Sequence, residues 1–402
     1  MKQGGGIKNG WDLKKIGDVC EIVNGGTPDT KVAKFWDGDN LWITPKDMGQ
    51  LDCVYVEDTL RKITDEGLKN SSAKILPVNS VILSSRAPIG HLAINTKKIA
   101  TNQGCKGIVP KKGVSTLFLY YFLKNSVDLL NSLGSGTTFK EISGSKLAEV
   151  PIPIPPLPEQ HRIVTILDEA FAAIAKAKEN AEKNLANARE VFEAYLQSVF
   201  INRGPGWEQK SLKDIGITQT GTTPSTSDKE NFGNFIPFIK PADIDVHGIG
   251  DINYEGNGLS KIGMKRGRQM SSGSILMVCI GATIGKVGFT ERDVSCNQQI
   301  NSLTVNNGLL AKLLFYEMRT HDFFDKVMKG SAQATLPIIN KSKWERLTIN
   351  FPKSKSEQQY IITKLDTLLS ETQKLEAIYK KKLTGLYELK KSILEKAFNG
   401  EI

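Results

Sequence analysis

The run IGATIGKVG, residues 280–288, has glycines and a lysine of the kind found in phosphate-binding loops. A nucleotide-binding loop of that type keeps four residues between its glycines and places Ser or Thr after the lysine. Here Gly281 and Gly285 are one residue too close, and Val287 follows the lysine. A similar run, SRAPIGHLA at 85–93, has histidine in place of the lysine. We therefore expect a tight corner between two strands.

Other catalytic signatures are missing from the sequence. It contains no Gly-x-Ser-x-Gly, His-Glu-x-x-His, Asn-Pro-Pro-Tyr or Asp-Pro-Pro-Tyr run. Pro28-Asp29 has no convincing Glu-x-Lys partner for a nuclease metal site, and the Glu-Leu-Lys run at 388–390 falls in a predicted long helix. The five cysteines and four histidines are scattered, without a C-x-x-C pair. The sequence predicts reduced thiols, no metal site, no catalytic residue and no cofactor bound by this chain.

Targeting and membrane segments are also not expected. The start of the chain, MKQGGGIKNG, lacks the apolar stretch of a signal peptide, and no run approaches the roughly 18 apolar residues of a membrane helix. The most apolar window, SILMVCIGATIG at 274–285, predicts a buried strand because glycines interrupt it. Together with the cysteine usage, this favours a cytoplasmic protein without a membrane partner.

The chain repeats itself at an offset of 195 or 196 residues. GWDLKKIGD, residues 10–18, matches GWEQKSLKD at 206–214, and GGTPDTKVAKFW at 25–36 matches GTTPSTSDKENF. Further along, WITPKDM matches FIKPADI, and the Asn-Gln pair at 102–103 matches the pair at 297–298. So many matches in the same order indicate a tandem duplication. The loop after each Gly-Thr-Pro has fixed ends and a variable interior.

A long helix is predicted after each repeat. The proline-rich run VPIPIPPLPEQ at 150–160 is an extended connector, and SEQQ at 356–359 has Ser356 and Gln359 at capping-box spacing. About 40 residues without proline follow each start, enough for roughly 60 Å of helix. Apolar residues recur at alternating steps of three and four, which predicts a coiled-coil seam. The seam contains Ile163, Leu167, Ile174, Leu185 and Phe192 in one helix, and Ile361, Leu365, Leu375, Leu383 and Ile393 in the other.

Both seams interrupt this rhythm at the same place. Two consecutive steps of four occur at 177–181–185 and at 375–379–383, which should unwind the supercoil locally. Lys390 is the poorest fit to the pattern. Small residues in the first seam match large ones in the second, so we expect the helices to pair antiparallel. The alternative is that each helix packs only on its own domain.

Charge separates the repeats from the helices. The formal charge at pH 7 is +10: residues 1–157 contribute +5, residues 201–355 contribute +6, and the two helical segments contribute −1. A polyanion, an anionic membrane surface or an acidic protein would suit such a surplus. The surplus indicates that the repeats, not the helices, contact an anionic partner.

The order of these motifs resembles the specificity subunit of type I restriction-modification systems. The similarity lies in G-[GT]-T-P, SSRAPIG, the Asn-Gln pairs, GTTFKEI or GSAQATL, and the proline-rich entry to an EQ helix, most of them occurring twice. It implies an α+β fold with target recognition domains at 1–157 and 201–355. Long conserved helices at 158–200 and 356–402 would pair antiparallel between them with pseudo-two-fold symmetry.

The resemblance also implies a function. Each recognition domain would read one half of an interrupted, asymmetric sequence in double-stranded DNA, and the helical pair would set the spacing. The chain would be non-catalytic and would dock two methyltransferase (modification) subunits, which methylate adenine with S-adenosylmethionine. Restriction subunits would add translocation and cleavage, so ATP and magnesium would also belong to partner subunits.

Polar residues at or beside the repeated motifs are the candidates for DNA contact, because base edges are read by such side chains. Some have a structural alternative: Asn102 and Asn297 could cap turns, and residues 265–268 could be a solvated charge run. Asp47 and Asp243 are expected to fix turns, since phosphate repels carboxylates. The candidates are Lys46, Arg86, Asn102, Gln103, Thr137, Thr138 and Lys140 in the first domain, and Lys240, Lys265, Arg266, Arg268, Asn297, Gln298, Ser331 and Gln333 in the second.

Two rival functions fit part of the pattern. A similar chain could serve a fused restriction-methylation enzyme of the type IIB or IIG kind. A non-catalytic, two-lobed scaffold could instead bind acidic partners through its basic domains, and it would show no preference among DNA sequences. Arg86 bears on specificity because its counterpart in the second repeat is Gly281. If it reads a base, it does so for one half-site.

Overall fold

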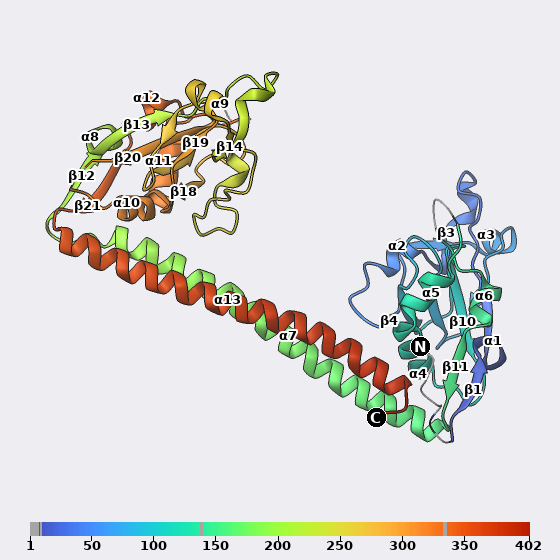
Figure 1. The fold of residues 1–402 in the computed structure, drawn as a ribbon. Helices are drawn as coiled ribbons and strands as arrows, with labels where there is room; N and C mark the ends of the chain where they lie inside the picture. Colours follow the sequence, from blue (N-terminus) through green and yellow to red (C-terminus); the bar gives the residue numbers. More distant parts are fainter. Residues whose placement is uncertain (1–7, 9, 137–139, 307, 333–335) are drawn as a thin grey trace. The chain divides into compact units, whose positions relative to one another are not determined.

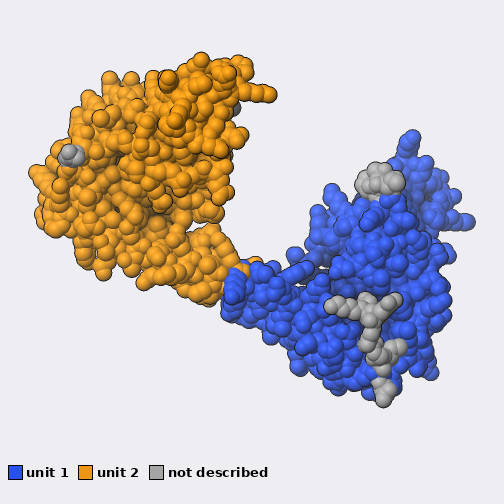
Figure 2. Space-filling view, viewed as in Figure 1, with its two compact units in different colours: residues 1–181, 381–402 blue, residues 182–380 orange. Residues whose placement is uncertain are grey.

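The chain folds into two compact units, each containing one repeat and parts of both long helices (Figure 1). In this computed structural model, unit 1 is Met1–Ala181 with Lys381–Ile402, and unit 2 is Glu182–Lys380 (Figure 2). The structure describes every residue of the chain apart from 1–7, 9, 137–139, 307 and 333–335.

Unit 1 is built around two mixed sheets, ordered β2-β10-β7-β8-β4 and β5-β3-β9-β6, and a short pair, β1-β11. Most neighbouring strands are antiparallel, but β3-β9 and β4-β8 are parallel. The strands are β1 (Asp12–Lys15), β2 (Cys20–Asn24), β3 (Trp36–Ile43), β4 (Tyr55–Val56), β5 (Arg61–Ile63), β6 (Ile75–Leu76), β7 (Val81–Ser84), β8 (Leu92–Asn95), β9 (Ile99–Thr101), β10 (Cys105–Pro110) and β11 (Pro151–Ile154). The helical segments before the long helix are α1 (Ile16–Val19), η1 (Ala33–Phe35), α2 (Pro45–Met48), α3 (Asp65–Lys69), α4 (Thr116–Asn125), α5 (Val127–Leu133) and α6 (Gly144–Ala148).

Unit 2 repeats this plan with sheets ordered β13-β20-β17-β18 and β15-β19-β16 and a short pair, β12-β21. Its strands are β12 (Trp207–Ser211), β13 (Gly216–Thr220), β14 (Phe232–Ile236), β15 (Phe238–Ile239), β16 (Gln269–Met270), β17 (Ile275–Val278), β18 (Val287–Phe289), β19 (Val294–Cys296), β20 (Ile300–Val305) and β21 (Thr348–Pro352). Its helical segments are α8 (Leu212–Ile215), η2 (Lys229–Asn231), η3 (Pro241–Asp243), α9 (Lys261–Arg266), α10 (Ala311–Met318), α11 (His321–Gly330) and α12 (Lys341–Trp344). The duplicated mixed α and β architecture expected from the sequence is confirmed.

The run with phosphate-loop features is a strand corner, as predicted. Strands β17 and β18 pair antiparallel on either side of it, and all four residues of β17 are buried. Gly281 and Gly285 lie in the turn at φ +105° and +89°, a backbone region that residues with a side chain rarely adopt. Its glycines therefore shape a turn and do not form a nucleotide loop.

The long helices are α7 (Leu157–Ile201) and α13 (Lys355–Phe398), and they pack together as predicted. In unit 1 the Lys390 ammonium lies 4.8 Å from the centre of the Phe171 ring. In unit 2 Arg189 donates to Glu376 at 2.6 and 3.1 Å. Phe171, earlier in α7, contacts Lys390, later in α13, whereas Arg189, later in α7, contacts Glu376, earlier in α13. The two helices therefore run antiparallel. No helix in the described ranges is long and apolar enough to cross a membrane.

The seam of α13 differs from the predicted one near its middle. Leu375 is 43% exposed, while the neighbouring Glu376 side chain is only 13% exposed. Glu376 turns inward because Arg189 from α7 and Lys380 from its own helix both donate to its carboxylate. The inward positions therefore run 368, 372, 376 and 379, so the two consecutive steps of four come seven residues, about two turns, before the predicted interruption at 375–379–383. Of the other predicted seam residues, Leu185, Leu383 and Ile393 are half-buried and the remainder are buried.

The predicted start of α13, with Ser356 as its capping residue, is also wrong. The helix begins at Lys355, and the Ser354 hydroxyl accepts a hydrogen bond from the Glu357 N–H. Ser354 is therefore the capping residue, and Ser356 lies inside the first turn. Ser354 precedes Glu357 by three residues, as Ser356 precedes Gln359, so the sequence pattern does not distinguish the two serines.

Both long helices complete the core of each unit. In unit 1, Phe398 near the end of α13 packs its ring 5.2 Å from Phe118 and 5.6 Å from Phe122 of α4. In unit 2, the core includes Phe192 from the later part of α7 and Leu365 from the early part of α13. Neither unit buries its apolar surface with its repeat alone.

A buried glutamine joins the start of each long helix to its repeat. Gln160 accepts from the Ser115 N–H at 2.8 Å and donates to the carbonyls of Gly113 and Pro155 at 2.9 Å. Gln358 accepts from the Leu310 N–H at 3.0 Å and donates to the Pro352 carbonyl at 2.8 Å. The EQ motif that opens both helices thus ties them to the domain that precedes them.

Candidate nucleic-acid interface

The Gly-Thr-Pro loop of unit 1 is held by the Asn-Gln turn between β9 and β10. The Thr27 hydroxyl donates to the side-chain oxygen of Gln103, and Asn102 donates to Thr27 at 2.8 Å. Asn102 also caps its own turn by accepting from the Gly104 N–H at 2.8 Å. A Cβ on Gly25 would stand 2.0 Å from the Asn102 carbonyl oxygen, so the close approach requires glycine.

Unit 2 has a similar arrangement, except that Asn297 donates to the Gln299 side chain and not to the threonine. The Thr223 hydroxyl donates to the side-chain oxygen of Gln298, and Asn297 accepts from the Gln299 N–H at 3.1 Å. A Cβ on Gly221 would stand 2.1 Å from the Asn297 carbonyl oxygen. We call these two sets, Thr27 with Asn102 and Gln103 and Thr223 with Asn297 and Gln298, the loop frames.

Each loop frame brings together two motifs that lie about 75 residues apart in sequence. Asn102 and Asn297 are half-buried and act as turn caps, which is the structural alternative raised from the sequence. Gln103 and Gln298 are exposed, and each uses its side-chain oxygen within the frame. DNA contact by these four residues stays a prediction.

The turn-fixing role expected for Asp47 and Asp243 is confirmed in the repeated segments WITPKDM and FIKPADI. Asp47 accepts from the Thr44 N–H at 3.0 Å, and Asp243 accepts from the Lys240 N–H at 2.9 Å. Lys46 is exposed on α2, and Lys240 is exposed just before η3. Both ammonium groups therefore lie on turns whose backbone is locked by a carboxylate.

Arg86 belongs to an ionic cluster that exists only in the first repeat. Its guanidinium lies 3.6 Å from one oxygen of Glu141, and the buried Lys106 lies 3.5 Å from the other. The Arg86 side chain remains 35% exposed. The corresponding positions in unit 2 are Ile280, Ile338 and Asn301, because the backbone bridge of Arg86 with Glu141 is equivalent to that of Ile280 with Ile338. The sequence alignment that placed Gly281 opposite Arg86 is therefore wrong by one residue. This polar cluster thus distinguishes the two repeats.

The basic run at 265–268 is not simply solvated. Arg266 pairs with Asp228 at 2.6 Å and donates to Asn231 at 2.9 Å, and Arg268 donates to the Thr220 carbonyl at 2.7 Å. Lys265 is exposed at the end of α9. Both arginines tie α9 and the following loop to the region of the second Gly-Thr-Pro loop.

The remaining candidates lie after α5 and α11. Lys140 is exposed, and the Ser331 hydroxyl donates to the Met328 carbonyl at 2.8 Å. Thr137, Thr138 and Gln333 fall outside the described residues. In unit 1 the chain after α5 returns beside the β7-β8 corner, where the Ile142 N–H donates to the Ser85 carbonyl. In unit 2 the chain after α11 returns beside the β17-β18 corner, where the Ile339 N–H donates to the Cys279 carbonyl.

Sequence reasoning missed Arg61, which starts β5. Its guanidinium carbon lies 3.8 Å from the centre of the Trp36 ring and 5.3 Å from that of Trp42. The two indoles pack edge to face with centres 5.1 Å apart. Trp42 donates to the Gly26 carbonyl at 2.9 Å and Trp36 to the Asp29 carbonyl at 3.1 Å, so both rings support the first Gly-Thr-Pro loop.

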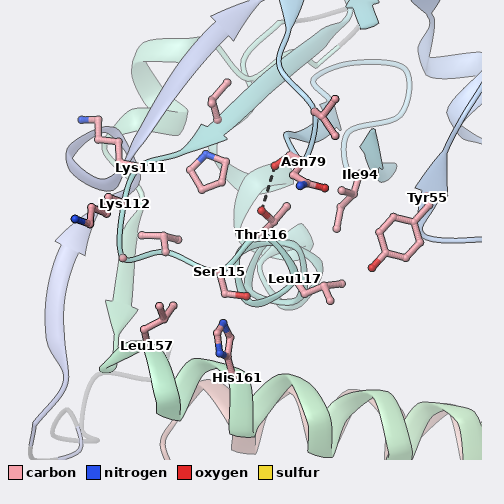
Figure 3. A pocket seen from close by; sticks show the side chains of 15 residues that line it. Tyr55, Asn79, Ile94, Lys111, Lys112, Ser115, Thr116, Leu117, Leu157 and His161 are labelled. Carbon is pink, nitrogen blue, oxygen red and sulfur yellow. Dashed lines mark hydrogen bonds between the residues drawn. The ribbon is translucent and has the colours of Figure 1, made fainter. Parts of the chain in front are cut away.

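A cavity of about 580 Å³ opens in unit 1 where α4 approaches the start of α7 (Figure 3). Lys111, Ser115, Thr116 and His161 are among its lining residues, but most of these polar groups are already bonded. Lys111 donates to the carbonyls of Gly17 and Asp18, and Thr116 donates to the Asn79 carbonyl at 3.1 Å. Among the described residues, no group of three or more His, Cys, Asp or Glu side chains could hold a metal ion.

The duplicated loop frames and paired long helices define a class of two-repeat proteins whose repeats share a scaffold and differ at their polar surfaces. The sequence model of the type I restriction modification DNA specificity domain matches residues 8–183 and again residues 205–384. The chain belongs to this family. Both matches contain one whole repeat and the beginning of the helix that follows it.

Curated relatives carry the same description. The MjaIX specificity subunit of Methanocaldococcus jannaschii is 36% identical over 252 residues, which cover 59% of this chain and 58% of the relative. The EcoR124I/EcoR124II specificity subunit of Escherichia coli is 28% identical over 196 residues, covering 47% of this chain and 48% of the relative. The chain therefore spans about half the length of these two relatives.

Solved structures share the fold over the full chain. One is a chain from a study of complex assembly and conformational transition of the type I R-M system, with a TM-score of 0.80, 19% identity and coverage of 99% of this chain and 100% of that one. The other is the HsdS subunit from Thermoanaerobacter tengcongensis, with a TM-score of 0.65, 18% identity and full coverage of both chains. At these identities the likeness concerns the fold.

Proposed function

We propose that this chain is the sequence-specific DNA-binding subunit of a type I restriction-modification complex. Each repeat reads one half of a bipartite, asymmetric target, and the paired helices set the spacing between the halves. The observation that carries this proposal is the loop frame, present twice with the same threonine-to-glutamine hydrogen bond beside a loop whose interior differs between the two copies. A common frame with variable contents suits two domains that read different sequences.

The charge distribution supports a polyanionic partner. The repeats carry +5 and +6, and the helical segments carry −1. Lysine and arginine gain affinity by neutralising phosphates, and this term is independent of sequence and sensitive to salt. Selectivity must then come from side chains that reach base edges.

This chain would carry out no chemistry of its own. Strand corners, turn caps and helix ties account for the motifs described above, and no nucleophile lies beside a general base among them. Modification subunits would bind S-adenosylmethionine and methylate adenine, and restriction subunits would use ATP and magnesium. The protein would act in the cytoplasm, where the DNA of a restriction host lies.

The long helices are the proposed docking site for two modification subunits. Leu375 and Ile378 of α13 and Val191 of α7 are exposed apolar residues within unit 2. Tyr387 and Leu389 are exposed apolar residues of α13 within unit 1. Apolar residues that recur on an exposed helix face suit a protein partner, because the surrounding contacts remove them from water.

A domain exchange tests this function. The chain is co-purified with its modification subunits, and methylated adenines in host DNA define the target. Replacing residues 1–157 by the corresponding domain of a relative should change one half of the target and leave the other. A change in both halves, or in neither, contradicts the one-domain, one-half-site assignment.

Binding at rising salt separates this function from a charge scaffold. A specificity subunit should keep a preference for its target over unrelated duplex as salt weakens phosphate contacts. A scaffold for acidic partners would bind all duplexes alike. Equal affinity for target and random DNA at every salt concentration would contradict the proposal.

A further inference from the structure

Arg61 has the geometry of a ligand-binding arginine, because its guanidinium contacts the protein through two tryptophan rings. In the part of the chain that the structure describes, its guanidinium has no hydrogen-bond or ion-pair partner. Arg86 and Arg266 differ, because each is paired with a carboxylate. Arg61 is exposed, so its N–H groups are open to solvent.

Neighbouring acidic groups do not compete for Arg61. Asp58 lies 3.3 Å from the Lys62 ammonium, and Glu66 is paired with Lys34. Asp65, the other carboxylate of the adjoining helix, accepts from the Asn40 side chain at 2.8 Å. None of these carboxylates pairs with Arg61, so its guanidinium remains available to an acceptor from outside the protein.

The position of Arg61 is fixed by both its backbone and its stack. It lies opposite Trp42 in the β3-β5 pair, and the Thr59 hydroxyl accepts from the Trp42 N–H at 3.1 Å and donates to the Arg61 carbonyl at 2.7 Å. Stacking on Trp36 then holds the guanidinium side chain near the loop that Trp36 and Trp42 support. A planar fork held in this way loses little entropy when it binds.

The second repeat has no arginine at the position equivalent to Arg61. Trp36 pairs with Ile63 in unit 1, and Phe232 bridges to Leu259 in unit 2, so the two pairs are equivalent. By the same alignment Asn257 takes the place of Arg61, and Phe238 takes that of Trp42. A phosphate contact would suit both repeats equally, since phosphates are the same in both half-sites. A difference of this kind is expected of a residue that reads a base.

We propose that Arg61 is a specificity-determining residue that reads a guanine edge in the half-site bound by the first repeat. The N–H fork of arginine matches the O6 and N7 acceptors of guanine, the commonest specific contact to that base. Trp36 is a positioning residue that orients the fork. This inference rests on the proposed function, because it requires that unit 1 binds duplex DNA.

The test uses the full chain with its modification subunits and a randomised duplex library as the probe. Wild type, Arg61→Ala and Arg61→Lys are each used to select bound duplexes. Arg61→Ala should lose the preference for one G·C pair in one half-site, by about 10- to 100-fold, and keep every preference in the other half. Arg61→Lys should weaken the same preference by a smaller factor, because an ammonium group lacks the planar fork. Arg61→Lys should retain the salt dependence of wild type because it keeps the charge.

Lys62→Ala is the matched control, since it removes a cation one residue away that is paired with Asp58. It should keep the wild-type selection. Tryptophan fluorescence and thermal unfolding of each variant establish that unit 1 is folded.

Unchanged selection by folded Arg61→Ala would overturn the inference, as would an equal loss of affinity for all duplexes, which marks a phosphate contact. Selection of no sequence by the wild type would instead contradict the proposed function. The two failures are therefore distinguishable.

Discussion

Glu317 of α10 is a carboxyl group buried in the core of unit 2, with 1% of its surface exposed. The Asn350 N–H donates to both of its oxygens at 2.7 Å, and the Asn350 side chain donates at 3.0 Å. Burial raises the pKa of Glu317 to about 7, and the hydrogen bonds from Asn350 oppose that rise. The folded unit therefore holds a proton that the unfolded chain releases at lower pH.

This group should make unit 2 lose stability as pH rises. With a folded pKa of about 7 and an ordinary value of 4.5, its contribution is complete below pH 4.5 and is lost as pH rises through 7. Glu317→Gln keeps an acceptor for Asn350 and should flatten the dependence of the unfolding midpoint between pH 4.5 and 7. The check is thermal unfolding across this range, with exposed Glu371→Gln as the control. Identical pH profiles for Glu317→Gln and wild type would refute the assignment.

Gly221 offers a second test at the scale of single residues. An added methyl group at this position would stand 2.1 Å from the Asn297 carbonyl oxygen and 2.4 Å from that of Cys296. Gly221→Ala should cost about 1–3 kcal/mol of unfolding free energy, because the backbone of the loop frame must move apart. Gly256→Ala is the matched control, since nothing lies within 4 Å of its added Cβ. Urea denaturation measures both variants, and equal stability would mean that the frame is not closely packed.

At the scale of elements, the tie between Gln358 and the repeat carries the clearest consequence. Gln358→Ala leaves the Leu310 N–H and the Pro352 carbonyl without their partner in a buried site. Each unsatisfied buried group costs about 1–3 kcal/mol, so we expect a loss of about 2–6 kcal/mol in the unfolding free energy of unit 2. Gln359→Ala, at an exposed position on the same turn, should change it by less than about 0.5 kcal/mol. Denaturant unfolding followed by circular dichroism decides the comparison.

The duplication and the long helices could be predicted from sequence because both are periodic. Matches at a constant offset reveal a repeat, and steps of three and four reveal a packed helix face. The inward turn of Glu376 could not be predicted, since its cause is Arg189 on the other helix, 187 residues away. A pattern of apolar residues favours Leu375, but an ion pair between helices selects its neighbour.

The candidate interface likewise contains some residues that the sequence could reveal and others that it could not. Asn102 and Gln103 stood out because they recur in the second repeat, and they do lie against the repeated Gly-Thr-Pro loop. Arg61 does not recur, and its ring partner Trp36 reaches it only through strand pairing. Comparing repeats finds what they share, whereas residues that distinguish the two half-sites must be found from tertiary contacts.

At the scale of the whole molecule, the residue range of unit 2 predicts which fragment can fold alone. Glu182–Lys380 is continuous in sequence and contains its repeat with the adjoining parts of both long helices. A fragment of residues 182–380 should therefore unfold cooperatively. A fragment of residues 205–355 lacks Phe192, Phe200 and Leu365 of the core and should not give a cooperative transition.

Thermal unfolding of the two fragments followed by circular dichroism provides the comparison. Cooperative unfolding of the shorter fragment at the same midpoint would show that the helices add nothing to this core. A non-cooperative melt of the longer fragment would show that unit 2 depends on the rest of the chain.

Unit 1 has a different dependence, because its core includes Leu394, Ala397 and Phe398 from the end of α13. On a ribosome these residues are made after all of unit 2. Unit 2 can therefore fold while the core of unit 1, whose repeat was synthesised first, still lacks Phe398. Synthesis of the last turns of α13, and not emergence of the first repeat, therefore becomes the event that completes unit 1.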